Sequence, residues 1–141
     1  MKTLETLHLH CRCGSTALTI TAAPVAQLYC HCDDCRSAHA AAYVAESLYP
    51  AEAVEVTGLV PEPVVVKATR RMRCPACSTH LFSEIESAGL RSVNAFLLPA
   101  KAFTPQLHIQ CQHAILPVAD NLPHYKGFPP AFGGTDERVE W

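Results

Sequence analysis

Hydrophobic and polar residues alternate in several short segments of the chain, the pattern of strands with one buried face. Residues 4–10 and 17–21 alternate on either side of a turn at Cys13-Gly14-Ser15, so we expect a hairpin there. Further strands are expected at 53–57, 64–68, 81–85, 91–96 and 107–111. The sequence therefore predicts a mainly β fold.

Helical periodicity is confined to one short segment, 36–42, with the sequence RSAHAAA. Eleven prolines and six glycines are spread along the chain and disfavour long helices. We interpret the three arginines before Cys74 as strand residues that face water, and four aromatic residues as core. The arginines are Arg70, Arg71 and Arg73, and the aromatic residues are Tyr43, Phe82, Phe96 and Phe103.

Length and composition predict a single globular domain, since 141 residues with 49% hydrophobic and 17% charged residues suffice for one core. We expect that core over about 4–125, followed by an extended C-terminal tail over 126–141. A net charge of -2 gives no basic face, which disfavours a nucleic-acid partner. The absence of a signal peptide or a long apolar segment predicts a cytoplasmic protein without a membrane partner, and leaves a homodimer open.

Eight cysteines carry the candidate chemistry, and a reducing cytoplasm favours metal binding by thiol clusters over disulfides. They fall into three clusters and one single residue. These are Cys11 with Cys13, then Cys30, Cys32 and Cys35, then Cys74 with Cys77, and finally Cys111.

Two close cysteine pairs predict a closed structural zinc site. Thiols at short spacing on turns reach one zinc ion without straining the backbone, and zinc prefers four ligands in a tetrahedron. Cys74 and Cys77 form one pair and Cys11 and Cys13 the other. Such a site stabilises the fold and leaves no position for a substrate.

The three thiols of Cys30, Cys32 and Cys35 predict a second, different zinc site. Three ligands leave a fourth coordination position for water, a substrate thiol or a distant side chain. The spacing alone leaves open whether the position stays open or is closed by a fourth protein ligand. The residues available to close it are His31, His39, Cys111 and His113.

The order of these clusters resembles the family of glutathione-dependent formaldehyde-activating enzymes, which has an Mss4-like fold. The resemblance runs from about Leu9 to Tyr125, although Ser78 stands where the family commonly has glycine. The segments that carry it are Cys11-Arg12-Cys13-Gly14, Cys30-His31-Cys32-Asp33-Asp34-Cys35-Arg36 and Cys74-Pro75-Ala76-Cys77-Ser78-Thr79-His80-Leu81-Phe82, with a weaker match at Leu107-His108-Ile109 and Leu122-Pro123-His124-Tyr125.

The resemblance implies stacked antiparallel sheets with zinc-bearing hairpins and one short helix. It assigns the two cysteine pairs to a structural zinc, and it makes Cys30, Cys32 and Cys35 ligands of a second, catalytic zinc. It also implies a carbon–sulfur lyase reaction on a glutathione or other small-thiol adduct, such as S-hydroxymethylglutathione. Arg36 would then contact a glutathione carboxylate.

Two other interpretations remain at this point. A non-catalytic zinc module that binds another protein would have a closed second site. A thiol-redox enzyme would use Cys111 as its nucleophile, in which case replacing Cys32 would leave catalysis intact.

Overall fold

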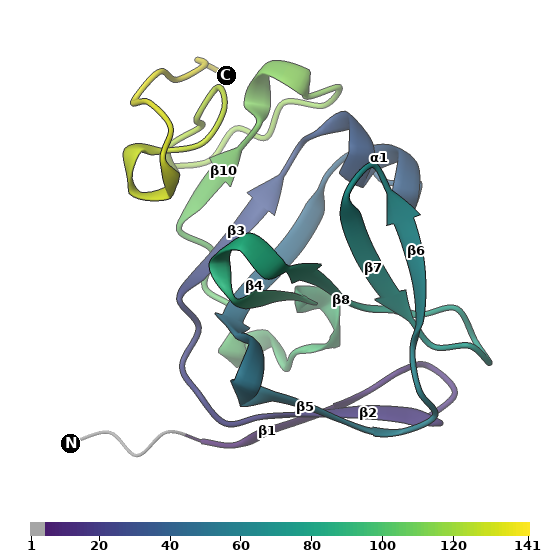
Figure 1. The fold of residues 1–141 in the computed structure, drawn as a ribbon. Helices are drawn as coiled ribbons and strands as arrows, with labels where there is room; N and C mark the ends of the chain where they lie inside the picture. Colours follow the sequence, from purple (N-terminus) through teal and green to yellow (C-terminus); the bar gives the residue numbers. More distant parts are fainter. Residues whose placement is uncertain (1–4) are drawn as a thin grey trace. The chain divides into compact units, whose positions relative to one another are not determined.

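The computed structural model describes residues 5–141 of the chain, coloured from purple to yellow along the sequence in Figure 1. These residues form ten β-strands, one α-helix and six short 3₁₀ helices, so the mainly β prediction is confirmed and the content is consistent with an Mss4-like fold. The strands and the helix are β1 Leu7–His10, β2 Thr16–Ile20, β3 Ala26–Cys30, α1 Asp33–His39, β4 Val44–Pro50, β5 Val54–Gly58, β6 Glu62–Val66, β7 Thr69–Arg73, β8 His80–Ile85, β9 Leu90–Asn94 and β10 Leu107–Ile109.

The described residues divide into two compact units. Unit 1 comprises residues 5–26 and 47–103, and unit 2 comprises residues 27–46 and 104–141. Unit 1 contains the first and third cysteine clusters, whereas unit 2 contains the second cluster and Cys111.

The N-terminal hairpin of unit 1 forms as the alternation predicts. β1 pairs with β2 and β2 with β5, both antiparallel, in the order β1-β2-β5 (Figure 1). Leu18 and Ile20 point to the buried face and are fully buried, as the two-residue period of a strand requires. The expected start at Leu4 lies outside the described residues.

Four strands of unit 1, β6 to β9, form an antiparallel meander in sequence order. Phe82 of β8 lies opposite Met72 of β7 and Val93 of β9. Leu81 and Phe82 are adjacent, and both are buried. Both faces of β8 are therefore covered, which explains its continuous apolar run.

Two expectations about unit 1 side chains are wrong. Arg71 of β7 is buried, with 6% exposure, although we expected it to face water. Phe96 follows β9 in a short 3₁₀ helix and is 75% exposed, although we expected it in the core. In both cases residue type was a poor guide, because burial depends on which way the backbone turns the side chain.

Unit 2 departs from the antiparallel pattern. β10 pairs with β3 in parallel, with Leu107 opposite Leu28 and Ile109 opposite Cys30. A parallel bridge between His108 and His124 then adds the C-terminal segment to the other edge of β10. This is a parallel pairing within a fold of mainly antiparallel strand pairs, and the long connection between β3 and β10 allows the chain to return in the same direction.

The tail over 126–141 is not simply extended. It contains a 3₁₀ turn at Pro130–Phe132 and folds back, so that Arg138 forms an antiparallel bridge with Tyr125 (Figure 1). The backbone N–H of Val139 also donates to the carbonyl of His124. These bonds hold the end of the tail beside the segment at which it begins.

Helix α1 begins three residues earlier than the expected segment at 36–42. The Cys32 thiol caps it by accepting a hydrogen bond from the Cys35 N–H. The carboxylates of Asp33 and Asp34 in the first turn interact favourably with the positive end of the helix dipole. The helix ends at His39, and the next residue, Ala40, caps it with a left-handed backbone.

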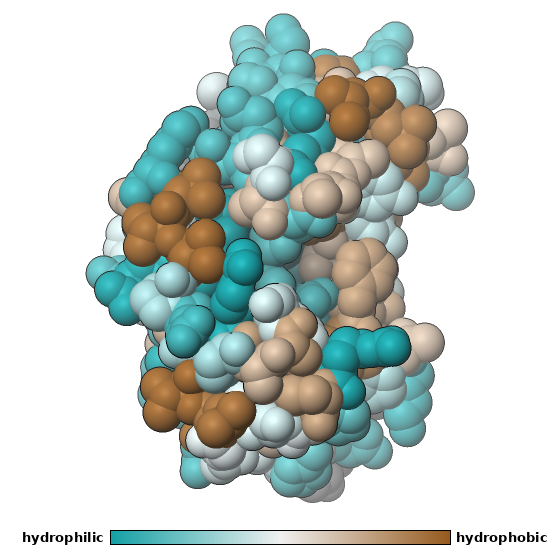
Figure 2. Space-filling model, turned by 90° about the vertical axis from the view of Figure 1, so that its right-hand side faces the viewer, coloured by the Kyte–Doolittle hydropathy of each residue, from teal (hydrophilic) through white to brown (hydrophobic). Residues whose placement is uncertain are grey.

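No helix in the stretch 5–141 is long and apolar enough to cross a bilayer. On the face displayed in Figure 2, apolar residues form small patches bordered by hydrophilic ones. The exposed apolar side chains of unit 1 include Val60 as well as Phe96.

Phe82 and Phe96 provide a matched test of the unit 1 core. Phe82→Ala removes a ring that is 2% exposed and leaves a cavity, so it should lower the free energy of unfolding by about 3–5 kcal/mol. Phe96→Ala should change it by about 0.5 kcal/mol or less, since its ring is already in water. Urea denaturation at constant metal content measures both, and equal losses would contradict the assigned core.

Candidate metal centres

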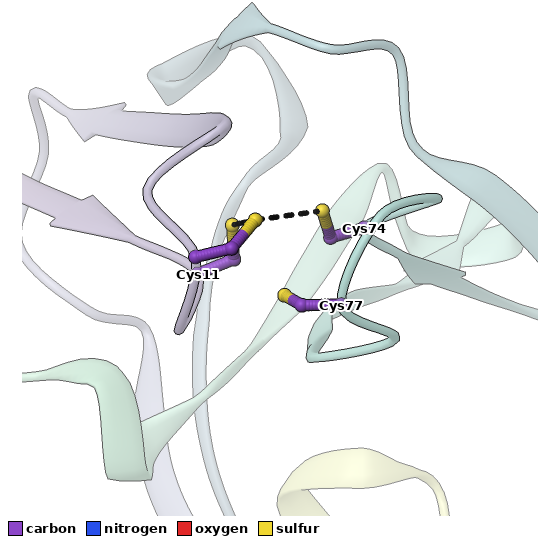
Figure 3. Close-up of side chains that lie close together, drawn as sticks. Cys11, Cys74 and Cys77 are labelled. Carbon is purple, nitrogen blue, oxygen red and sulfur yellow. Dashed lines mark hydrogen bonds between the residues drawn. The ribbon is translucent and has the colours of Figure 1, made fainter.

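Two turns of unit 1 bring four thiols together. Cys11 and Cys13 lie on the turn between β1 and β2, and Cys74 and Cys77 on the turn between β7 and β8. All four sulfurs lie within 4.8 Å of one another. Figure 3 shows the labelled sulfurs of Cys11, Cys74 and Cys77 pointing toward one another from these loops.

The spacing of these sulfurs fits one tetrahedral zinc ion. Four sulfurs about 2.3 Å from a zinc ion are about 3.8 Å from one another. The Cys11 and Cys13 sulfurs are 3.6 Å apart, and the Cys13 and Cys74 sulfurs are 3.8 Å apart. The four side chains could therefore hold a zinc ion with little rearrangement.

The two turns share one backbone design. In the first, the Gly14 N–H donates to the Cys11 carbonyl at 3.0 Å, and in the second the Ser78 N–H donates to the Cys74 carbonyl at 2.9 Å. Gly14 and Ser78 both have a left-handed backbone, with φ of 78° and 63°. Ser78 therefore keeps the conformation that glycine adopts more easily.

Hydrogen bonds favour the thiolate form of two members of this cluster. The Thr79 hydroxyl and backbone N–H lower the pKa of Cys77 to about 5, and the hydroxyl lies 3.1 Å from its sulfur. Burial alone would raise the pKa of Cys11, but hydrogen bonds from the Thr16 N–H and neighbouring thiols bring it below its usual value. For a third member, Cys13, the hydrogen bonds with Ser15 lower the pKa, but burial and the bonds with Cys11 and Cys77 outweigh them and raise it. Thiolates are the form that binds metal.

In unit 2, the end of β3 and the start of α1 gather the second set of thiols. Cys30 ends β3, Cys32 caps α1 and Cys35 lies in its first turn. Their sulfurs all lie within 4.8 Å, with Cys30 and Cys35 3.7 Å apart. Cys30 and Cys35 are buried, whereas Cys32 is half-buried. This cluster is therefore reachable from solvent on the side of Cys32.

The second cluster differs from the first in its electrostatics. Hydrogen bonds with Cys32 and Cys35, together with burial, raise the pKa of Cys30 well above its usual value. For Cys35, the hydrogen bond with Cys30 lowers the pKa, but the bond with Cys32 and burial outweigh it and raise the pKa to about 12. These thiols keep their protons unless a cation replaces them.

None of the four candidates for a fourth ligand joins this cluster. Within the described part of the chain, the ligand group around these thiols contains only the three cysteines. The ring of His31 instead faces His108, with its Nε2 2.9 Å from His108 Nδ1. Burial raises the pKa of Cys111 to about 12, which disfavours a thiolate nucleophile there.

An open pocket of about 680 Å³ lies along α1, the helix that carries Cys35. Arg36 lines it together with Asp33 and Asp34, and small residues form much of the remaining wall. The Arg36 Nε donates to the carbonyl of His31 at 3.3 Å, which fixes the side chain beside the pocket. The lining of the pocket therefore carries both positively and negatively charged side chains.

Unit 2 contains a further group of potential ligands that the sequence did not predict. It consists of His108 on β10 with Asp120 and His124 of the segment that follows. The two histidines belong to the weaker matching segments quoted above, but their spacing gives no metal-binding signal. Only the parallel bridge between His108 and His124 brings them together.

Ser78→Gly should stabilise the protein. A left-handed backbone costs a residue with a side chain about 1–2 kcal/mol, and glycine avoids this cost. Glycine also loses more conformational freedom on folding, which offsets part of the gain. We expect a gain of about 0.5–1 kcal/mol in the free energy of unfolding. The matched control is Ser15→Gly in the sister turn, where φ is not positive and the same change should destabilise. A loss of stability in Ser78→Gly would refute the argument.

Comparison with known proteins agrees with the resemblance of the cysteine clusters. No curated protein sequence matches the chain. The model of the family described as glutathione-dependent formaldehyde-activating enzyme matches residues 6–113, which include all eight cysteines. Because this match covers well over half of the 141 residues, the chain belongs to the glutathione-dependent formaldehyde-activating enzyme family.

Proposed function

We propose that the chain is a zinc-dependent carbon–sulfur lyase that acts on an adduct of glutathione or of another small thiol, such as S-hydroxymethylglutathione. The observation that carries the proposal is the three-thiol cluster of Cys30, Cys32 and Cys35, with no fourth protein ligand in its group among residues 5–141. Family membership supports the glutathione and formaldehyde chemistry.

The two thiol clusters would have different roles. Cys11, Cys13, Cys74 and Cys77 would hold a structural zinc that joins two turns of unit 1. Cys30, Cys32 and Cys35 would hold a second zinc with one position left for substrate. A zinc ion bound there would act as a Lewis acid, stabilising either the thiolate of the substrate or the oxygen of the hemithioacetal.

The residues around the second cluster suit a zwitterionic thiol. Glutathione has two carboxylates and one ammonium group, and the pocket along α1 offers one guanidinium and two carboxylates. Arg36 would bind a substrate carboxylate, and Asp33 or Asp34 would face the ammonium group. Half-buried Cys32 lies at the start of the same helix, so a thiol bound in the pocket is close to the cluster.

The other two interpretations have less support. A closed structural site would need a fourth ligand, and none of the four candidate residues belongs to the thiol group. Thiol-redox chemistry at Cys111 would need an accessible thiolate, but its side chain is 4% exposed and its pKa is raised to about 12.

Zinc content tests the two-site assignment. Protein purified without chelator should contain about two zinc ions per chain, and Cys32→Ser should contain about one while keeping its circular dichroism spectrum. Cys111→Ser is the control and should keep two, since Cys111 belongs to neither thiol group. Elemental analysis measures the zinc content per chain of each protein. An unchanged content in Cys32→Ser would rule out zinc binding by this cluster.

Substrate recognition is tested by how much the protein accelerates the combination and separation of glutathione and formaldehyde over the spontaneous rate. Exchange NMR measures it. Arg36→Ala should raise KM about tenfold or more with little change in kcat, because a hydrogen bond to a charged group contributes about 1.5–3 kcal/mol.

Arg70→Ala is the matched control, because Arg70 is an exposed arginine of unit 1 and should leave both constants unchanged. Cys32→Ser should abolish the acceleration. If Cys32→Ser keeps full activity and Cys111→Ser loses it, the thiol-redox interpretation replaces this one.

A further inference from the structure

A cluster of rings surrounds one carboxylate in unit 2, apart from the thiols. His108 lies on β10, and Asp120 and His124 lie on the segment after it. One donor atom from each of the three lies within 4.8 Å of the other two. The family match ends at residue 113, so Asp120 and His124 lie beyond it.

The two histidines present the same ring nitrogen to the same carboxylate. The Nε2 of His108 is 2.8 Å from Asp120 Oδ2, and the Nε2 of His124 is 2.9 Å from Asp120 Oδ1. Two ligand atoms about 2.1 Å from one ion and at right angles to each other lie about 3.0 Å apart. The observed separations therefore suit adjacent ligands of a six-coordinate ion.

A second layer of contacts holds this arrangement in place. His31 Nε2 is 2.9 Å from His108 Nδ1, which fixes the orientation of the His108 ring. The ring of Trp141 packs against His124 and His108, with centroids 4.6 and 5.8 Å away. Ligating histidines in proteins are oriented in this way through their second nitrogen.

Two proton arrangements fit the contact between His31 and His108, and one of them leaves His108 Nε2 free to bind a cation. If His31 Nε2–H donates to His108 and His108 Nε2–H donates to Asp120, the Nδ1 of His31 is left with a lone pair. This fully buried atom has no hydrogen-bond partner. If His108 Nε2 binds a cation, His108 Nδ1–H donates to His31 and His31 Nδ1 carries a proton. The ring centroids of Tyr43 and Trp141 each lie 5.1 Å from the ring centroid of His31.

The cluster is open on one side. The His108 side chain is fully buried and that of His124 is 10% exposed, but the Asp120 side chain is 31% exposed. An ion can therefore enter past Asp120, and water can fill the coordination positions that the protein leaves.

We propose that His108, Asp120 and His124 form a third metal site, built of nitrogen and oxygen ligands, for a divalent first-row transition ion. Two imidazoles and one carboxylate are the ligand set of sites that keep open positions for small ligands. The site differs from the two thiol clusters in the metal ions that it prefers, because imidazole and carboxylate ligands suit Mn²⁺, Fe²⁺ and Co²⁺ better than thiolates do. The inference is independent of the proposed lyase function.

Cobalt provides the test, on the full chain with both thiol clusters first filled with zinc. Calorimetry should detect one Co²⁺ bound per chain, with weak visible absorption and without the strong near-ultraviolet bands of cobalt–thiolate bonds. Asp120→Asn and His124→Gln should each weaken binding at least tenfold, since each removes a ligand. His113→Gln is the control, an exposed histidine of the same unit, and should bind Co²⁺ unchanged.

A second measurement needs no substitution. In the wild-type protein, Co²⁺ is paramagnetic and should strongly shift the imidazole NMR signals of His108 and His124 while leaving those of His113 in place. If no Co²⁺ binds beyond the thiol clusters, or if Asp120→Asn binds it as tightly as wild type, the metal site is refuted and the cluster is a hydrogen-bond network.

Discussion

Repulsion between thiolates is the constraint on which unit 1 depends. Two negative charges 3.8 Å apart repel by about 4 kcal/mol at an effective dielectric constant of 20. Four sulfurs that would carry such charges as metal ligands converge at the junction of two turns that are about 60 residues apart in the chain. A divalent cation at their centre would offset the repulsion between these thiolates and join the two turns.

The backbone prepares that junction before any ion is considered. Each turn donates an N–H to the carbonyl of its first cysteine and then passes through a left-handed residue, Gly14 or Ser78. The Thr79 hydroxyl lies beside the sulfur of Cys77 and also accepts the Arg12 N–H from the opposite turn. The same polar groups thus shape the turns, connect them and stabilise the thiolate.

Much of unit 1 could be predicted because its information is local. The alternation gives the hairpin of β1 and β2, and short thiol spacing indicates which turns could bind metal. β3 and β4 were missed because most of their residues are buried, so they show no alternation. The start of α1 was missed because its cap is a thiol, Cys32, rather than one of the usual oxygen-bearing residues.

The cluster of His108, Asp120 and His124 could not be predicted for a different reason. Its members are spaced by 12 and 4 residues without an α-helix between them, and they meet because β10 runs parallel to β3 and the following segment returns beside it. Long-range pairing of this kind leaves no periodic trace in the sequence. The fold is needed before the chemistry can be recognised.

The contrast between the two thiol clusters bears on which of them can do chemistry. Protons compete with a metal ion for each sulfur, and they compete better where the pKa is higher. In the first cluster the pKa values of Cys11 and Cys77 are lowered and that of Cys13 is raised, so two of its thiols favour the thiolate form. In the second, those of Cys30 and Cys35 are raised, so protons compete more strongly with a metal ion for these sulfurs.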